Sequence, residues 1–307
     1  GVPYYDGVSI DNGKAFLYLG SQNGLAAAPA WSAESNIDSA NFGISVATAG
    51  DVNGDGYSDV VIGTNKFTGD QQNEGKVFVY YGSASGLSSV PDWNAEGNQV
   101  NCKFGNSVST AGDVNGDGYS DVIIGANLFD NGQTDEGKVF VYHGSASGLS
   151  SSANWEYESN SANANFGHCV STAGDVNGDG FSDIIIGAYN YSFGETSEGK
   201  VYVVRGSSTG LVNTTTLQIE SNQVNTFYGW SVSSAGDVNG DGYGDVIVGA
   251  RNYDNGENDE GKVYVYHGMP ANILEGFTHG VAEPLAGIVR STVLEVAFGW
   301  KEWEIQL

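Results

Sequence analysis

Apolar and polar positions along the chain fall into short blocks that predict β-strands, and no helical period is present. Residues 43–49 (GISVATA) form a mixed block, 59–63 (DVVIG) is continuously apolar, and 76–82 (KVFVYYG) alternates β-branched and aromatic residues. A shorter block lies at 92–98 (DWNAEGN). Short apolar or alternating runs bounded by Gly-rich turns are typical of buried or half-buried strands. We therefore predict four strands in this part of the chain.

The same blocks return with a period of 62 residues. An Asp follows the first block at Asp51, Asp113, Asp175 and Asp237, and a Gly-Lys pair opens the third block at Lys76, Lys138, Lys200 and Lys262. A further copy of the third block, GKAFLYLG, begins at Gly13. Four short strands in each repeat, with tight turns between them, are the plan of a propeller blade. The fold class predicted is therefore all-β, a β-propeller of four-stranded blades.

Strand parity separates the turns of such a blade into two faces. Strands that run up and down place the turns after the first and third strands on one face of the disc. The turns after the second and fourth strands then lie on the other face. The acidic turn after strand one is therefore separated from the long turn after strand two.

The turn after the first strand has the oxygen pattern of a calcium loop. In DVNGDGYSD (51–59), side-chain oxygens stand at positions 1, 3, 5 and 9, and Gly56 stands at position 6. The first half of an EF-hand loop has this spacing, with a backbone carbonyl as the ligand at position 7. Oxygen donors without His or Cys favour Ca²⁺ over zinc or copper. The alternative is a polar turn that binds no ion, but four copies with the same like-charged carboxylates argue against it.

We expect about four Ca²⁺ ions, one for each loop. The predicted ligands, with the position-7 residue contributing its backbone carbonyl, are Asp51, Asn53, Asp55, Tyr57 and Asp59; Asp113, Asn115, Asp117, Tyr119 and Asp121; Asp175, Asn177, Asp179, Phe181 and Asp183; and Asp237, Asn239, Asp241, Tyr243 and Asp245.

The composition narrows the classes of partner. The net charge is −26, from 37 acidic and 11 basic residues, and this surface would repel nucleic acid and anionic lipid. No stretch is long and apolar enough to predict membrane insertion. The two cysteines, Cys102 and Cys169, could pair or remain thiols. Because the chain starts at Gly1 and its one Met is Met269, we expect a processed or excised segment.

The repeated motifs resemble the FG-GAP repeat of integrin α-subunit β-propellers and their relatives. The resemblance covers residues 11–268 and is carried by pairs such as Phe42-Gly43 and Phe104-Gly105, by the DxNxDGxxD loops, and by the segments IGAN (124–127), IGAY (186–189) and VGAR (248–251). It implies Ca²⁺ in the four loops, extracellular placement and a binding role. It also implies that ligands meet the face opposite the calcium turns.

The number of blades is the main departure from that family, whose propellers usually have seven. At this period seven blades need about 434 residues and five need about 310, close to the 307 present. We predict five blades, the alternative being part of a seven-bladed propeller. The propeller would occupy 1–268, with a half blade in 1–41, repeats from 42, 104 and 166, and a last repeat from 228 whose completeness the pattern leaves open. Residues 269–307 leave the pattern; they could be strands that complete the first blade, a foreign tail or a separate module.

The long turn after strand two carries an aromatic residue in register in each repeat. These residues, the candidate ligand-binding positions, are Phe67, Phe129, Tyr191 and Tyr253. Aromatic rings among Asn, Asp and Gln suit stacking on sugars, whereas packing between blades is the alternative and the more frequent role.

No catalytic set of residues is evident, so we predict that the protein is not an enzyme. We expect a secreted or cell-surface, calcium-stabilised propeller for recognition, adhesion or scaffolding, with an extracellular glycan or protein as its ligand. The alternative is a catalytic or non-catalytic propeller domain of a polysaccharide-active enzyme.

Overall fold

The strands lie close to the blocks predicted from the sequence. The computed structural model describes residues 1–7 and 9–270, and this part contains β-strands and no helix. The hypothesis that 269–307 complete the first blade concerns residues that, from 271 on, lie outside the described part.

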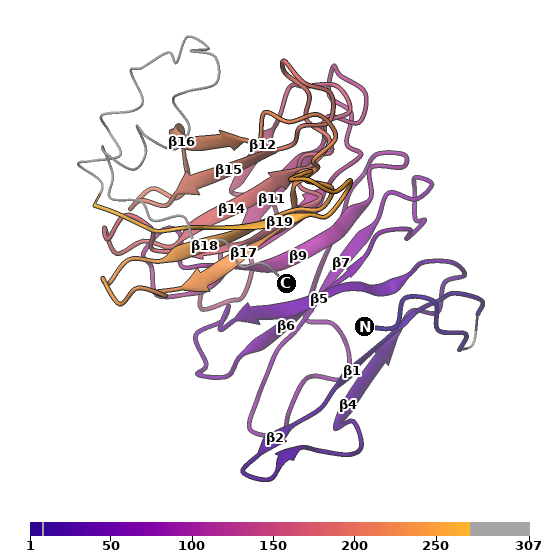
Figure 1. Cartoon of the computed structure of the whole chain (residues 1–307). Coiled ribbons are helices and arrows are strands. Elements are labelled where there is room, and N and C mark those ends of the chain that lie inside the picture. The colour runs from indigo at the N-terminus through magenta and orange to yellow at the C-terminus, as the bar shows by residue number, and fades with distance from the viewer. Residues whose placement is uncertain (8, 271–307) are drawn as a thin grey trace.

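Three sheets are complete four-stranded antiparallel meanders. Their strands, in order within each sheet, are β5 (Phe42–Gly50), β6 (Asp59–Thr64), β7 (Lys76–Tyr80) and β8 (Trp93–Glu96); β9 (Phe104–Gly112), β10 (Asp121–Ala126), β11 (Lys138–Tyr142) and β12 (Trp155–Glu158); and β13 (Cys169–Gly174), β14 (Asp183–Ala188), β15 (Lys200–Arg205) and β16 (Val212–Glu220). The sheets follow one another in chain order (Figure 1). The all-β propeller prediction with its 62-residue repeat is confirmed.

Two partial sheets lie at the ends of this series. The first pairs β1 (Lys14–Leu17) with β4 (Trp31–Glu34), the third and fourth strands expected of a half blade. Between them, β2 (Gly20–Ser21) and β3 (Gly24–Leu25) form a small hairpin that the sequence did not predict. The last sheet holds β17 (Tyr228–Gly236), β18 (Asp245–Ala250) and β19 (Lys262–Tyr266). The described part therefore shows about four to five blades.

The hydrophobic core lies between neighbouring blades. The first strands β5, β9, β13 and β17 contact one another in sequence, and a separate buried cluster fills each junction between blades. The indole of Trp93 belongs to one blade and donates its Nε1 hydrogen to the Ser150 carbonyl of the next at 2.9 Å. Trp31 makes the same bond to Ser88. These two tryptophans therefore join neighbouring blades.

The aromatic-Gly pair at or just before the start of each first strand brings two backbones into contact. Phe104 is fully buried, and a Cβ added to Gly63 would lie 2.0 Å from the carbonyl oxygen of Gly105 in the next blade. Only glycine permits this approach, since any side chain would overlap the backbone. Gly63, Gly125 and Gly187, each one residue before the end of its strand (β6, β10 and β14), therefore set the spacing of successive blades.

The two cysteines are free thiols. Cys102 is buried, and its Sγ donates to the Glu74 carbonyl at 3.0 Å. The disulfide that the sequence left open is therefore not formed.

Candidate calcium-binding loops

Each acidic loop is held by the side chain of its first Asp. In the loop after β5, Asp51 Oδ1 accepts from the backbone N–H groups of Gly54 (2.7 Å) and Asp55 (3.1 Å), and its Oδ2 accepts from Gly56 (2.8 Å). Gly54 and Gly56 have φ of 72° and 88°, in the left-handed region that favours glycine. The GDG segment therefore lets the chain fold around one carboxylate.

The Asp at position 9 connects two turns of the same blade. Asp59 is fully buried; its Oδ2 accepts from Val52 N–H at 2.9 Å and its Oδ1 from Gly82 N–H at 2.8 Å, just after β7. The other three loops repeat both bonds through Asp121, Asp183 and Asp245. This carboxylate therefore begins the second strand and also ties the loop to the end of the third.

The buried carboxylates lack full compensation for their charge. Burial raises the pKa of Asp121 and Asp183 to about 7, with smaller contributions from the carboxylates at positions 1 and 5 of the same loops. Burial also raises the pKa of Asp59, and Asp55 and Asp51 add to the effect. The three acidic side chains of a loop are thus near enough to repel one another. A bound cation would relieve this repulsion.

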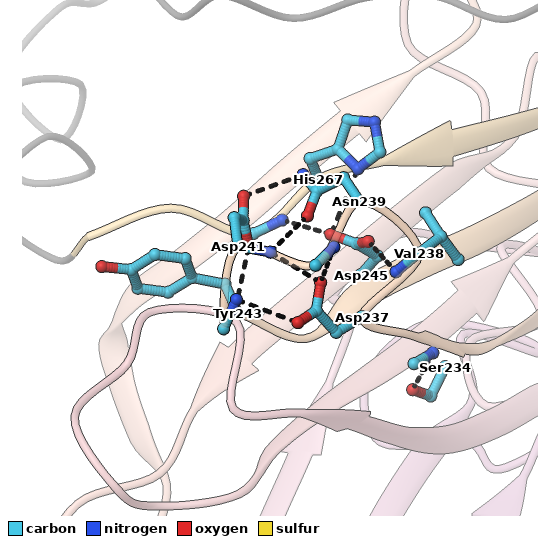
Figure 2. A network of polar contacts seen from close by, with 12 residues as sticks. Ser234, Asp237, Val238, Asn239, Asp241, Tyr243, Asp245 and His267 are labelled. Atoms are coloured by element: carbon cyan, nitrogen blue, oxygen red, sulfur yellow. Dashed lines mark hydrogen bonds and ion pairs between the residues drawn. The ribbon is translucent and has the colours of Figure 1, made fainter.

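The donor chemistry of each loop fits Ca²⁺. Three carboxylates, one carboxamide and one backbone carbonyl are hard oxygen donors, and a carboxylate oxygen that accepts one N–H keeps a second lone pair. Figure 2 shows Asp237, Asn239, Asp241 and Asp245 gathered around the last loop. The hydrogen bonds of the loop occupy these side chains, and within residues 1–7 and 9–270 no three His, Cys, Asp or Glu side chains converge on one point as a metal cluster. The residues present therefore fit the ion by their donor chemistry.

The loops also join neighbouring blades, a role that the sequence reasoning missed. Ser120, at position 8 of the second loop, donates its N–H to the Asp51 carbonyl (2.9 Å) and accepts the Asp51 N–H on its Oγ (3.2 Å). The ring of Tyr119 covers Gly54, so a Cβ there would lie 2.5 Å from a ring carbon. The sequence feature that could have indicated this role is an aromatic residue at position 7 followed by Ser at position 8 in the first three loops. The last loop has Gly244 in place of the Ser.

The four aromatic candidates lie beneath lysine ammonium groups. The Nζ atoms of Lys76, Lys138, Lys200 and Lys262 stand 4.8, 5.0, 4.3 and 5.1 Å from the ring centroids of Phe67, Phe129, Tyr191 and Tyr253, respectively. Phe67 is buried, and the other three rings pack against the inter-blade clusters. Packing between blades accounts for these contacts.

The fold and loops define the class: a β-propeller whose blades repeat an acidic loop after the first strand. The family model of the FG-GAP repeat matches residues 42–80, 104–142, 167–204 and 228–266, and the chain belongs to this family.

Curated relatives of the chain are integrin α subunits. It is 37% identical over 236 residues to integrin alpha-V of Gallus gallus, covering 74% of this chain and 21% of that protein. It is 32% identical over 249 residues to integrin alpha-5 of Xenopus laevis, covering 78% and 22%. It is 33% identical over 233 residues to integrin alpha pat-2 of Caenorhabditis elegans, covering 68% and 18%. The chain therefore spans about a fifth of the length of these relatives.

Proposed function

We propose that the chain is the calcium-binding propeller of an extracellular protein that acts in recognition or adhesion, without an enzymatic activity of its own. The observation that carries the proposal is the fourfold repetition of one oxygen donor set, with a fully buried Asp in each copy. Membership of the FG-GAP family and similarity to integrin α subunits support the adhesion role.

The residues that would hold the ion are those of the loop itself. In the first loop these are Asp51, Asn53, Asp55 and Asp59 with the backbone carbonyl of Tyr57, and the other loops supply their equivalents. Calcium would supply positive charge to three carboxylates that otherwise repel one another. Asp51 and Asp59 already accept backbone N–H groups that fix the loop, so the chain orients these two before an ion binds.

We place the ligand on the face opposite the calcium loops and the protein outside the cell, either secreted or at its surface. The partner would be an extracellular protein or glycan. The large negative charge supports this placement, since it disfavours nucleic acid and anionic membranes. The described residues include no helix with the length and apolar character needed to cross a membrane.

An adhesion assay tests the proposal. The purified chain would be presented to immobilised extracellular-matrix protein and glycan fractions in calcium, in magnesium and in EDTA. We expect binding in calcium that EDTA abolishes. The matched variant carries Asp→Ala at position 5 of every loop (Asp55, Asp117, Asp179 and Asp241), and it should lose binding in calcium. Binding of equal strength in EDTA, or in this variant, would overturn the calcium part; absence of binding to any fraction would overturn the recognition role.

A further inference from the structure

Side chains that break the repeat gather on the face opposite the acidic loops. Each first strand runs from this face into its acidic loop, and each second strand returns to it. At the end of the second strand the register holds Asn65, Asn127, Tyr189 and Arg251; just after the aromatic-Gly pair it holds Ile44, Asn106, His168 and Trp230. The polar repeat positions thus become aromatic and cationic toward the last blade.

These residues form one continuous arc across three blade junctions, here called the Asn65–Arg251 arc. Asn65 Nδ2 donates to Asn106 Oδ1 at 3.0 Å, and Asn106 Nδ2 donates to the His168 carbonyl at 3.3 Å. The His168 ring lies 4.8 Å from Trp230, and the Arg251 guanidinium lies 4.5 Å from the Trp230 ring.

Aromatic surface dominates one end of the arc. Tyr189 stands 4.7 Å from Trp230 and 4.5 Å from His168, while Phe227 flanks both Tyr189 and Trp230. All four rings are half-buried, so part of each remains accessible. The rings also hold one another in place, as a preorganised stacking surface requires.

Positive charge without a counterion lies at both ends of the arc. Although the chain carries −26, Arg251 and the two lysines beside the Asn65 end, Lys66 and Lys103, form no ion pair within the described residues. Burial and the nearby Lys66 ammonium lower the pKa of Lys103. Two like charges held close together in an acidic protein are suited to an anion.

Buried polar atoms without partners complete the surface. Asn65 Oδ1, Asn127 Oδ1 and His168 Nδ1 are buried and have no hydrogen-bond partner. Such atoms carry a desolvation cost, and a ligand hydroxyl group would remove it where the side chain turns its polar atom toward the surface.

We infer that the Asn65–Arg251 arc binds an acidic oligosaccharide, with a sugar ring on the Trp230 end, hydroxyl groups on the amide acceptors and the carboxylate or sulfate groups at Arg251 and at Lys66 with Lys103. The inference rests on the proposed recognition function and names the ligand class and the residues that select it. An acidic peptide would match the cations, but its carboxylates would bring no hydroxyl donors to the amide oxygens.

Calorimetric titration of the full chain in calcium tests the site. The probes are a uronic-acid hexasaccharide, its carboxyl-reduced neutral counterpart and an acidic hexapeptide. We expect the unchanged chain to bind the uronic-acid hexasaccharide. The neutral counterpart should bind roughly ten- to hundredfold more weakly, and the Arg251→Gln variant should bind the uronic-acid hexasaccharide more weakly by the same factor, because a charged hydrogen bond is lost in each case. Trp230→Ala should weaken binding by a similar factor through lost stacking.

The matched control is Arg205→Gln, which removes a cation at the end of β15 beside the acidic loops and should leave the affinity unchanged. Unfolding curves would establish that each variant folds. If Arg205→Gln and Arg251→Gln weaken binding equally, the site is overturned. If Arg251→Gln does not weaken binding, the site is also overturned; this is the result expected if calcium bridges the sugar to the acidic loops. Tighter binding of the peptide would overturn the ligand class. If the chain adheres to matrix protein but binds no acidic sugar, this inference fails while the proposed function stands.

Discussion

Within each acidic loop, carboxylates of the same type differ in what they do. The buried position-9 Asp joins two turns of its blade through backbone N–H groups, whereas the position-5 Asp is exposed in the second loop and bonds only within it. The position-9 Asp thus supports the fold of the blade, whereas the position-5 Asp mainly supplies charge for the ion. The two contributions can be measured separately.

Asp121→Asn should destabilise the calcium-bound protein more than Asp117→Asn does. The amide offers an N–H₂ group where a second acceptor is needed, so the N–H of Val114 or Gly144 loses its partner, at a cost of about 1 to 3 kcal/mol. Asp117→Asn is the control, since it removes only charge from the exposed side of the loop. Urea unfolding in calcium at about pH 8, where Asp121 is ionised because its pKa is about 7, should show a loss for both variants that is larger for Asp121→Asn by this amount. In EDTA the uncompensated buried charge of Asp121 opposes folding, so its removal should offset the lost hydrogen bond, and Asp117→Asn should have little effect. The same profile for both variants would refute this division.

A second prediction concerns His168, on the face opposite the acidic loops, and the dependence of stability on pH. Burial lowers its pKa to about 4, below the ordinary value of 6.5. The unfolded chain therefore binds more protons between these values, so the contribution of His168 to stability is complete above pH 6.5 and is lost as the pH falls toward 4. By pH 4.5 the loss should be about 2 kcal/mol.

His168→Asn, which restores the residue found at Asn106 in the preceding repeat, isolates this term. The free energy of unfolding of this variant should fall less between neutral and acid pH than that of the unchanged chain. Identical pH profiles would show that His168 is not held in its neutral form.

Among the elements, the loop between the first and second strands also acts as the joint between blades. Backbone bonds link each loop to the next, and a ring from the following loop covers the position-4 glycine in the first three loops. In the last loop, no described residue lies near the Cβ position of Gly240, and Val238 is 56% exposed whereas Val52 is fully buried. Neighbouring blades therefore determine how far each loop is buried.

A glycine series tests the joint. Gly54→Ala should cost more than Gly240→Ala, because both place Ala at positive φ but only Gly54 lies against a ring. The left-handed backbone alone costs roughly 1 to 2 kcal/mol, and the clash with Tyr119 should add a similar amount. Gly56→Ala lies in the same loop as Gly54, with no residue of the described part near its Cβ, and controls for local unfolding of the last blade. Equal free energies of unfolding for all three variants would show that the contact between Gly54 and Tyr119 does not stabilise the junction between blades.

For the whole molecule, regular positions could be predicted and irregular ones could not. The apolar run of β10 and the alternation of β11 specify strands locally, and repetition of the Asp positions specifies the loops. The β2–β3 hairpin was missed because its two-residue strands leave no period to detect. The contact between His168 and Trp230 depends on how two blades meet, which no spacing within one repeat contains. Resemblance to a family therefore locates the residues that the repeats share. A ligand site made of residues that differ between the repeats becomes visible only in the three-dimensional structure.

The most direct test of the central claim, that calcium in four loops stabilises the propeller, is a calorimetric calcium titration of the full chain paired with its melting temperature in calcium and in EDTA. The account predicts about four ions per chain, and a melting temperature that rises with free calcium, because ligand binding to the folded state stabilises it by mass action. A chain that binds no calcium, or one whose melting temperature is the same in calcium and in EDTA, would contradict the claim.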